Sequence, residues 1–111
     1  MDFEKARKAA LEFRSARDWE QFHNPKDLAL SISLEASELL ELFQWSGTDV
    51  DVTQKHDAMR EELADVMIYC IYMAEQLNID IPTEIAAKIA KNDLRYPIAK
   101  ARGTSRKYTE L

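Results

Sequence analysis

The chain has 111 residues, of which 46% are hydrophobic and 32% are charged, and its formal net charge is −5 at pH 7. This composition excludes an intrinsically disordered chain, and the length fits one domain over residues 1–111. The net negative charge argues against a protein that coats nucleic acid. The longest stretch without a charge, "VMIYCIYMA" at 66–74, has about half the length that spans a bilayer, so no membrane segment is predicted.

The single cysteine, Cys70, cannot form an internal disulfide, and no charged and then apolar leader opens the sequence. We therefore predict a cytoplasmic protein in a reducing compartment. Two glycines and three prolines leave little turn chemistry, whereas residues that favour helices are abundant. The predicted fold class is all-α, as a bundle of about four helices.

Turn and capping residues delimit the first two predicted helices. The first covers residues 3–22, where small and apolar residues recur close to the helical period. The second begins at Pro25, because Asn24 is a good N-cap residue and proline suits the first helical position. It is expected to run to about Trp45, with Gly47 as its C-terminal cap.

The third predicted helix begins near Asp51 or Thr53 and continues to Leu77. Apolar residues cover it nearly all round, and a helix of this kind must be enclosed. Since a small chain supplies few layers to enclose it, we predict oligomerisation through this segment. A fourth helix is expected from about Pro82 to a point before Pro97, because a residue that precedes proline avoids the helical conformation. The tail beyond it has weak periodicity, and we expect it to be ordered against a partner subunit or a ligand.

Two pairs of acidic residues interrupt the apolar sequence, and the members of each pair are three residues apart. They are Glu35 with Glu38 and Glu62 with Asp65. Residues at this spacing share one face of a helix. If the second and third helices form an antiparallel hairpin, the two pairs come level, because Glu38 and Glu62 both lie roughly 10 to 14 Å from the turn.

Four carboxylates that face one another in a bundle must be protonated, solvated or neutralised by a cation. A site of oxygen ligands alone suits Mg2+, and Mn2+ is possible. The alternative is two solvated acidic faces, which is the commoner meaning of a single ExxE pair. The matched heights and the apolar flanks favour a shared site. Glu41 and Glu61 lie nearby and are interpreted mostly as surface residues.

Aromatic residues near the acidic pairs are candidates for substrate contacts. Trp45 shares the carboxylate face of the second predicted helix by spacing, and it could stack on a base or belong to the core. Tyr69 lies in line with the acidic pair of the third helix, where it could donate a hydrogen bond to substrate or pack. In "DWEQFHNP", Trp19, Phe22 and His23 form an aromatic cluster that could line a base pocket, although His23 also fits a structural role.

The segment from Lys88 to Lys107 is basic, with Asp93 as its single acid. Three of its polar residues stand on one helical face, namely Lys88, Asn92 and Arg95. Two cations and an amide could hold a triphosphate. A solvated charged face is the alternative.

The sequence resembles the MazG-like all-α nucleoside triphosphate pyrophosphohydrolases. The resemblance rests on the two acidic motifs, ExxE and ExxD, which are separated by a gap of 23 residues. Five further segments are similar to the dCTP pyrophosphatase branch of the family, and the likeness extends over nearly the whole chain from about Phe13. These segments are "DWEQFHNP", "ELLELFQW", "EELADVMIY", "KNDLRYP" and "SRKYTEL".

The resemblance implies Mg2+-dependent hydrolysis of a (deoxy)nucleoside triphosphate, with dCTP or a modified dCTP favoured, to the monophosphate and pyrophosphate. The family's metal ligands map onto Glu35, Glu38, Glu62 and Asp65. Its phosphate-side residues map onto Lys88, Asn92 and Arg95 with Tyr69, and its base-stacking aromatics onto Trp19 and Trp45, with His23 nearby. It also implies a homotetramer, a dimer of dimers, with sites made between subunits. The loop after Trp45 looks shorter than in animal members, which puts the substrate contacts of that loop in question.

In such a reaction the metal would offset charge on the phosphates and lower the pKa of the attacking water. Lys88 and Arg95 would stabilise the leaving pyrophosphate, and Glu38 is the favoured acceptor of the water's proton. Two alternatives stay open: a helical oligomeric module that binds or senses nucleotide without turnover, and a pyrophosphohydrolase that prefers dUTP or another triphosphate.

Overall fold

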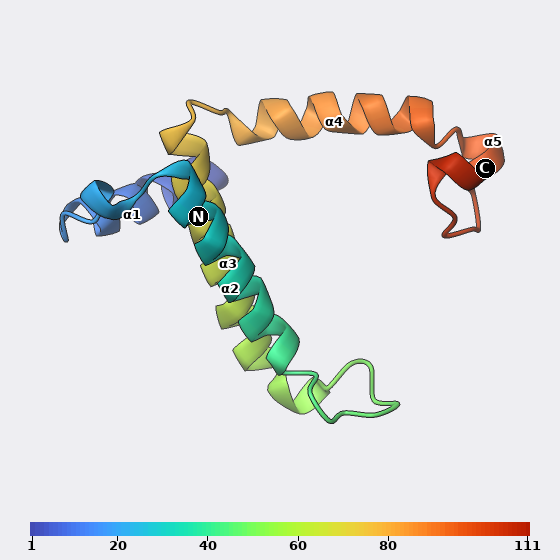
Figure 1. The fold of residues 1–111 in the computed structure, drawn as a ribbon, viewed down its shortest axis with the longest axis horizontal. Coiled ribbons are helices and arrows are strands. Elements are labelled where there is room, and N and C mark those ends of the chain that lie inside the picture. Colours follow the sequence, from blue (N-terminus) through green and yellow to red (C-terminus); the bar gives the residue numbers. More distant parts are fainter. The chain divides into compact units, whose positions relative to one another are not determined.

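The structure, a computed structural model, describes residues 1–111 and consists of helices joined by loops and turns (Figure 1). The all-α prediction is confirmed. The chain divides into two compact units, Met1–Asn78 and Ile79–Leu111, each with its own internal contacts. None of the helices combines the length and the apolar character that a membrane span requires.

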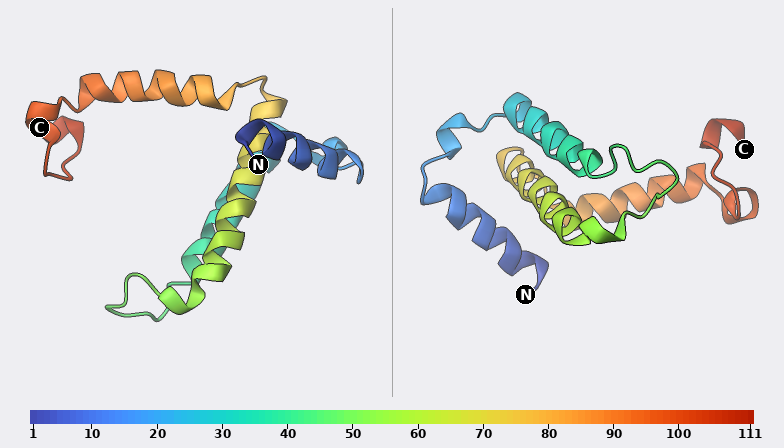
Figure 2. Two further views of the ribbon diagram at one scale, coloured as in Figure 1. Left: turned by 180° about the vertical axis from the view of Figure 1, so that it is seen from behind. Right: turned by 90° about the horizontal axis from the view of Figure 1, so that it is seen from below.

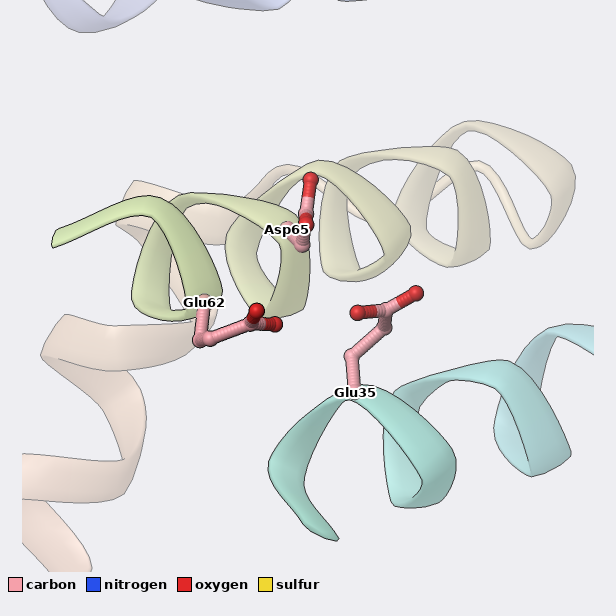
Figure 3. Close-up of side chains that lie close together, drawn as sticks. All are labelled: Glu35, Glu62 and Asp65. Atoms are coloured by element: carbon pink, nitrogen blue, oxygen red, sulfur yellow. The ribbon is translucent and has the colours of Figure 1, made fainter. Parts of the chain in front are cut away.

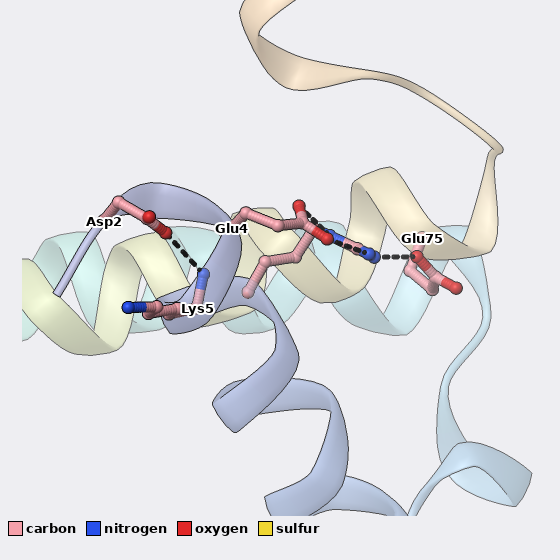
Figure 4. Close-up of polar contacts among 5 residues, drawn as sticks. Asp2, Glu4, Lys5 and Glu75 are labelled. Atoms are coloured by element: carbon pink, nitrogen blue, oxygen red, sulfur yellow. Dashed lines mark hydrogen bonds and ion pairs between the residues drawn. The ribbon is translucent and has the colours of Figure 1, made fainter.

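Helix α1 covers Phe3–Ser15, and the side chain of Asp2 caps it by accepting a hydrogen bond from the backbone N–H of Lys5 at 2.9 Å (Figure 4). The predicted helix over residues 3–22 is too long. The chain leaves the helix because Asp18 adopts a φ of 53°, in the left-handed region that an α-helix does not use. A short 3-10 helix over Glu20–Phe22 follows this break.

Ion pairs tie the first turns of α1 to the end of α3. Arg7 donates to Glu4 through Nε and Nη2, at 2.9 and 2.8 Å, and to Glu75 through Nη1 at 3.0 Å (Figure 4). The pair with Glu75 joins the two helices, whereas the pair with Glu4 lies within α1, and both are open to screening because the side chains are partly exposed.

Helices α2, Pro25–Glu41, and α3, His56–Gln76, lie side by side as an antiparallel hairpin (Figures 1 and 2). The start of α2 agrees with the prediction, since Asn24 accepts a hydrogen bond from the backbone N–H of Asp27 at 2.9 Å and Pro25 occupies the first turn. A 3-10 helix over Thr53–Lys55 leads into α3, close to the predicted start.

The end of α2 differs from the prediction. The helix stops at Glu41, and tighter turns follow in which the N–H of Phe43 donates to the carbonyl of Leu40 at 3.0 Å. Trp45 then adopts a φ of 66°. Gly47 also has a positive φ, of 61°, but it lies beyond the helix end and so is not its cap. The spacing argument that extended the helix to Trp45 is therefore wrong.

The core of the first unit is small and centres on the second half of α3. Ile71, Tyr72 and Ala74 are buried there, together with Leu28 of α2. The hydroxyl of Tyr72 donates to the carbonyl of Ala10 at 3.0 Å, which fixes α1 against α3. Several large apolar side chains of the hairpin stay exposed, namely Leu30, Leu34, Leu63 and Met67. Oligomerisation through this hairpin stays a prediction.

The second unit contains α4, Ile81–Arg95, and α5, Ile98–Ala101, followed by a 3-10 helix over Tyr108–Glu110. The bounds of α4 agree with the prediction, because Asp80 caps the helix by accepting from the N–H of Thr83 at 3.2 Å. In the tail, the Tyr108 ring meets the Tyr96 ring edge to face at 5.9 Å between centroids.

Candidate functional site

The hairpin of α2 and α3 brings three acidic residues together: Glu35 from α2, and Glu62 and Asp65 from α3 (Figure 3). Each contributes a carboxylate oxygen to a group in which these atoms all lie within 4.8 Å of one another. The spacing of three residues puts Glu62 and Asp65 on one face of α3. The antiparallel packing then places Glu35 opposite them.

Glu38 lies beside this group. It is more exposed than Glu35 and Glu62, yet it is close enough to share a hydrogen bond with each of them. It therefore forms a more exposed side of the same acidic patch. Glu41 and Glu61 are exposed, as interpreted from the sequence.

The environment makes these carboxylates difficult to ionise together. Burial raises the pKa of Glu35 from 4.5 to about 7, with further contributions from the hydrogen bond to Glu38 and from the neighbouring negative charges. Burial, and then the hydrogen bond to Glu38, also raise the pKa of Glu62. The group thus stores unfavourable electrostatic energy that a cation would relieve.

One oxygen of Glu35 and one of Glu62 (Oε2 in each) are buried and accept no hydrogen bond. Buried polar atoms normally have a partner, so two unpartnered oxygens in one acidic group suggest a missing ligand. Several carboxylate oxygens without histidine or cysteine form a donor set for a hard divalent cation. The residues present therefore fit a divalent metal.

A cavity of about 470 Å3 adjoins the acidic group. Glu35 and Asp65 contribute to its lining, together with α1 residues such as Ala9 and Ala10. Four aromatic side chains also line it: Phe13, Trp19, Tyr69 and Tyr72. Its size and its largely apolar wall are typical of sites that bind small organic molecules.

The structure gathers three of the predicted substrate-contact residues around this cavity. Trp19 lines it and meets Phe13 edge to face at 5.7 Å. Tyr69 lines it and meets Tyr72 edge to face at 5.8 Å. His23 is not part of the lining, but its ring packs on Tyr72 with the centroids 5.2 Å apart.

The prediction that Trp45 shares the carboxylate face of α2 is wrong in its premise, because it assumes that the helix continues to Trp45. The helix ends at Glu41, and the turns after it have different geometry, so the helical spacing no longer applies. Trp45 is 93% exposed and takes no part in the core. An indole exposed to this degree is uncommon.

Lys88, Asn92 and Arg95 lie on α4, in the unit Ile79–Leu111, whereas the acidic group belongs to the unit Met1–Asn78. The guanidinium of Arg95 stacks over the Tyr108 ring at 4.9 Å. Contact of these residues with a phosphate stays a prediction.

Sequence reasoning missed two residues at the cavity: Tyr72, which lines it, and Arg14, which packs against Tyr72. Tyr72 could have been found, because it lies three residues after Tyr69 on α3 and therefore close to the same face. Arg14 gives no such signal, because an arginine in an amphipathic helix is normally exposed. Here it is only 6% exposed.

Comparisons with known proteins relate this arrangement to one family. The model of the MazG-like family matches residues 30–111. The chain is similar to dCTP pyrophosphatase 1 of Homo sapiens, with 42% identity over 97% of this chain, and to that of Rattus norvegicus, with 40% identity over 97%. It spans 66% of the length of each of these two relatives.

A crystal structure of a pyrophosphatase from Archaeoglobus fulgidus is similar in fold, with a TM-score of 0.80 and 36% sequence identity. The similarity covers 85% of this chain and 91% of the archaeal chain. The family model includes both helices of the hairpin that holds the acidic group, apart from residues 25–29 at the start of α2. The chain belongs to the MazG-like family.

Proposed function

We propose that the chain is a Mg2+-dependent pyrophosphohydrolase that converts a (deoxy)nucleoside triphosphate, favouring dCTP or a modified dCTP, to the monophosphate and pyrophosphate. The observation that carries the proposal is the acidic group of Glu35, Glu62 and Asp65 beside a cavity with aromatic walls. The human and rat relatives, named dCTP pyrophosphatase 1, support the choice of substrate.

The carboxylates of Glu35, Glu62 and Asp65, with Glu38 beside them, would hold the metal. A bound Mg2+ would offset negative charge on the phosphates and lower the pKa of a water molecule. The water oxygen would bond to the α-phosphorus while the bond from that phosphorus to the oxygen bridging the β-phosphorus breaks. Pyrophosphate then leaves with that bridging oxygen. Glu38 would accept the proton of the water, because it is more exposed to solvent than Glu35, the other member of the patch on α2.

The aromatic wall provides the surface for the nucleobase. Stacking of a base on an aromatic ring contributes about 1–3 kcal/mol, and Trp19 combines 40% exposure with a place in the cavity lining. Tyr69 and His23 would add hydrogen-bonding groups next to it. We extend the proposal to Trp45, whose exposed indole is free to cover a base from the loop after α2.

The phosphate side of the substrate needs cations in addition to the metal. Lys88 and Arg95 would supply them, with Asn92 as a further donor to phosphate oxygens. The cation–π contact between Arg95 and Tyr108 orients a guanidinium that has no acidic partner among the ion pairs of the chain.

We also propose that the protein acts as a homotetramer in the cytoplasm. The support for the assembly is the row of exposed apolar side chains on the hairpin, including Leu34, Leu63 and Met67. A patch of this kind is typical of an interface between subunits. Sedimentation analysis tests this proposal, and a monomer at micromolar concentration would contradict it.

The function is tested by incubating the protein with a panel of deoxynucleoside and ribonucleoside triphosphates and MgCl2, and separating the products by chromatography. We expect monophosphate and pyrophosphate in equal amounts, with dCTP consumed fastest. Asp65→Asn and Glu38→Gln should reduce the rate at least about 100-fold, while the matched control Glu41→Gln keeps it.

Other outcomes would identify the alternatives. Nucleotide that raises the melting temperature without any product would indicate a sensing module. Faster consumption of dUTP than of dCTP would keep the reaction and change the substrate. Release of inorganic phosphate from the γ-position would contradict cleavage between the α- and β-phosphates.

A further inference from the structure

Arg14 is a buried cation with too few partners. Its side chain lies at the end of α1 and is 6% exposed, yet Nε and Nη1 donate no hydrogen bond. The nearest carboxylate oxygen, Oε1 of Glu20, is 3.9 Å from Nε, which is too far for a hydrogen bond. A buried guanidinium with unpartnered donors is strongly destabilising. A role in the site would explain why a cation occupies this position.

The groups around Arg14 include two residues that line the cavity, Tyr72 and Trp19. Its guanidinium carbon lies 5.0 Å from the centre of the Tyr72 ring, and His23 packs on the same ring. The backbone carbonyl of Arg14 accepts a hydrogen bond from the N–H of Trp19 at 3.2 Å. The side chains of Arg14 and His23 therefore share the Tyr72 ring as a neighbour, and the backbone of Arg14 is bonded to Trp19.

His23 has a hydrogen-bond acceptor without a donor, which complements the unpartnered donors of Arg14. Its Nδ1 is buried and has no hydrogen-bond partner, like the two nitrogens of Arg14. A guanidinium only donates hydrogen bonds, and Nδ1 can accept one only when the imidazole is neutral and carries its proton on Nε2. A water molecule between the two side chains would satisfy both residues at once.

The charged groups near His23 favour this neutral form. Burial lowers the pKa of His23, the positive charge of Arg14 lowers it further, and Glu20 opposes them. The other titratable groups that face the ring are the phenols of Tyr69 and Tyr72, and burial raises the pKa of the Tyr72 phenol.

We propose that Arg14 is a positioning residue for the base side of the substrate: its side chain holds His23 as the Nε2–H tautomer. The Nε2–H group is then a hydrogen-bond donor for a base that offers an acceptor, next to the Trp19 ring. This inference rests on the proposed function, because the ligand is taken to be a nucleotide.

The first test needs no activity. Long-range 1H–15N NMR spectra report the tautomer of each of the two histidines, His23 and His56. In the wild-type protein and in the control Lys8→Met, which removes a cation from the exposed side of α1, we expect His23 as the Nε2–H form with a pKa below 6.5. In Arg14→Met we expect a mixture of tautomers and a higher pKa, since one cause of the lowering is gone. An Nδ1–H tautomer in the wild type, or a His23 that does not respond to Arg14→Met, would overturn the proposal.

The second test separates positioning from a general loss of structure. Arg14→Met should raise the KM for dCTP about tenfold, equivalent to one lost hydrogen-bonding contact, and change kcat by less than about twofold. Inhibition by tripolyphosphate, which has no base, should not change. Equal weakening of dCTP and tripolyphosphate binding would overturn the base-side role.

Stability provides the remaining check. Because Met replaces a buried charge with an apolar chain of similar length, Arg14→Met should unfold at the same temperature as the wild type or at a higher one. If it is unfolded instead, the wild-type spectra decide, and an Nδ1–H tautomer of His23 there would refute the proposal. If the wild type itself releases no pyrophosphate, the proposed function fails while the His23 spectra still decide the role of Arg14.

Discussion

Replacing Glu35 by glutamine should stabilise the metal-free protein while removing its response to metal. Burial raises the pKa of Glu35 from 4.5 to about 7, so the native state keeps this proton to a higher pH than the unfolded state does. Between these two pH values the unfolded chain binds fewer protons, and the free energy of unfolding therefore falls as the pH rises. Above about pH 7 the full cost of the charged carboxylate is present.

The size of this cost follows from the same shift. One pKa unit corresponds to about 1.4 kcal/mol, so a rise from 4.5 to about 7 sets an upper limit of about 3 kcal/mol. Since solvent reaches part of the Glu35 side chain, screening reduces the expected effect to ~1–2 kcal/mol. Glu35→Gln has nearly the same shape without the charge. At pH 8 the free energy of unfolding of Glu35→Gln should exceed that of the wild type by ~1–2 kcal/mol. At pH 4 the two proteins should have the same free energy of unfolding.

Urea denaturation at pH 4 and pH 8, at one protein concentration, measures the difference, first with a chelator and then with millimolar MgCl2. Magnesium should stabilise the wild type at pH 8, because it neutralises the acidic group, and should stabilise Glu35→Gln much less. Glu41→Gln, on the same helix but outside the group, is the control and should follow the wild type within about 0.5 kcal/mol. A metal-free Glu35→Gln that is less stable than the wild type at pH 8 would refute the electrostatic reasoning, and equal stabilisation of both by Mg2+ would refute the metal site.

Three further substitutions test other contacts. Tyr72→Phe removes the hydrogen bond to the carbonyl of Ala10 and should lower the free energy of unfolding by about 1 kcal/mol in urea titrations; no change would mean that water replaces the hydroxyl. Trp45→Ala should leave stability within about 0.5 kcal/mol, because the indole is 93% exposed, and should weaken dCTP binding in calorimetry about tenfold if the indole stacks on the base. Arg95→Met should raise the KM for dCTP and flatten its dependence on salt, whereas Tyr108→Phe, which keeps the ring under Arg95, should do neither. A KM for Arg95→Met with wild-type salt dependence would argue against contact with phosphate.

The acidic group was accessible to sequence reasoning because helical geometry is regular. The spacing of Glu62 and Asp65 fixes their common face, and the rise per residue brings Glu35 level with them once the hairpin forms. The starts of α2 and α4 were also predictable, since Asn24 and Asp80 are residues that cap helices through their own side chains.

The helix ends were harder to predict, because they depend on single residues in unfavourable conformations. Asp18 and Trp45 both adopt a positive φ, which the amphipathic pattern does not encode. The burial of Arg14 was inaccessible for a related reason. Its environment is created by Tyr72 and Glu20, which come from a different helix and from beyond the break in the chain.

In this hairpin the spacing of the carboxylates does not depend on the length of the connecting loop, although many binding sites couple such properties. The distance between the carboxylates of Glu35 and Glu62 depends on how α2 and α3 pack, and the loop over residues 42–52 lies at their far end. Residues can be added to or removed from that loop without rotating either helix, whereas one residue inserted within α2 would turn the following side chains by about 100°. A family built on this hairpin can therefore vary its loop, with an exposed aromatic such as Trp45 upon it, while the chemistry between the helices stays constant.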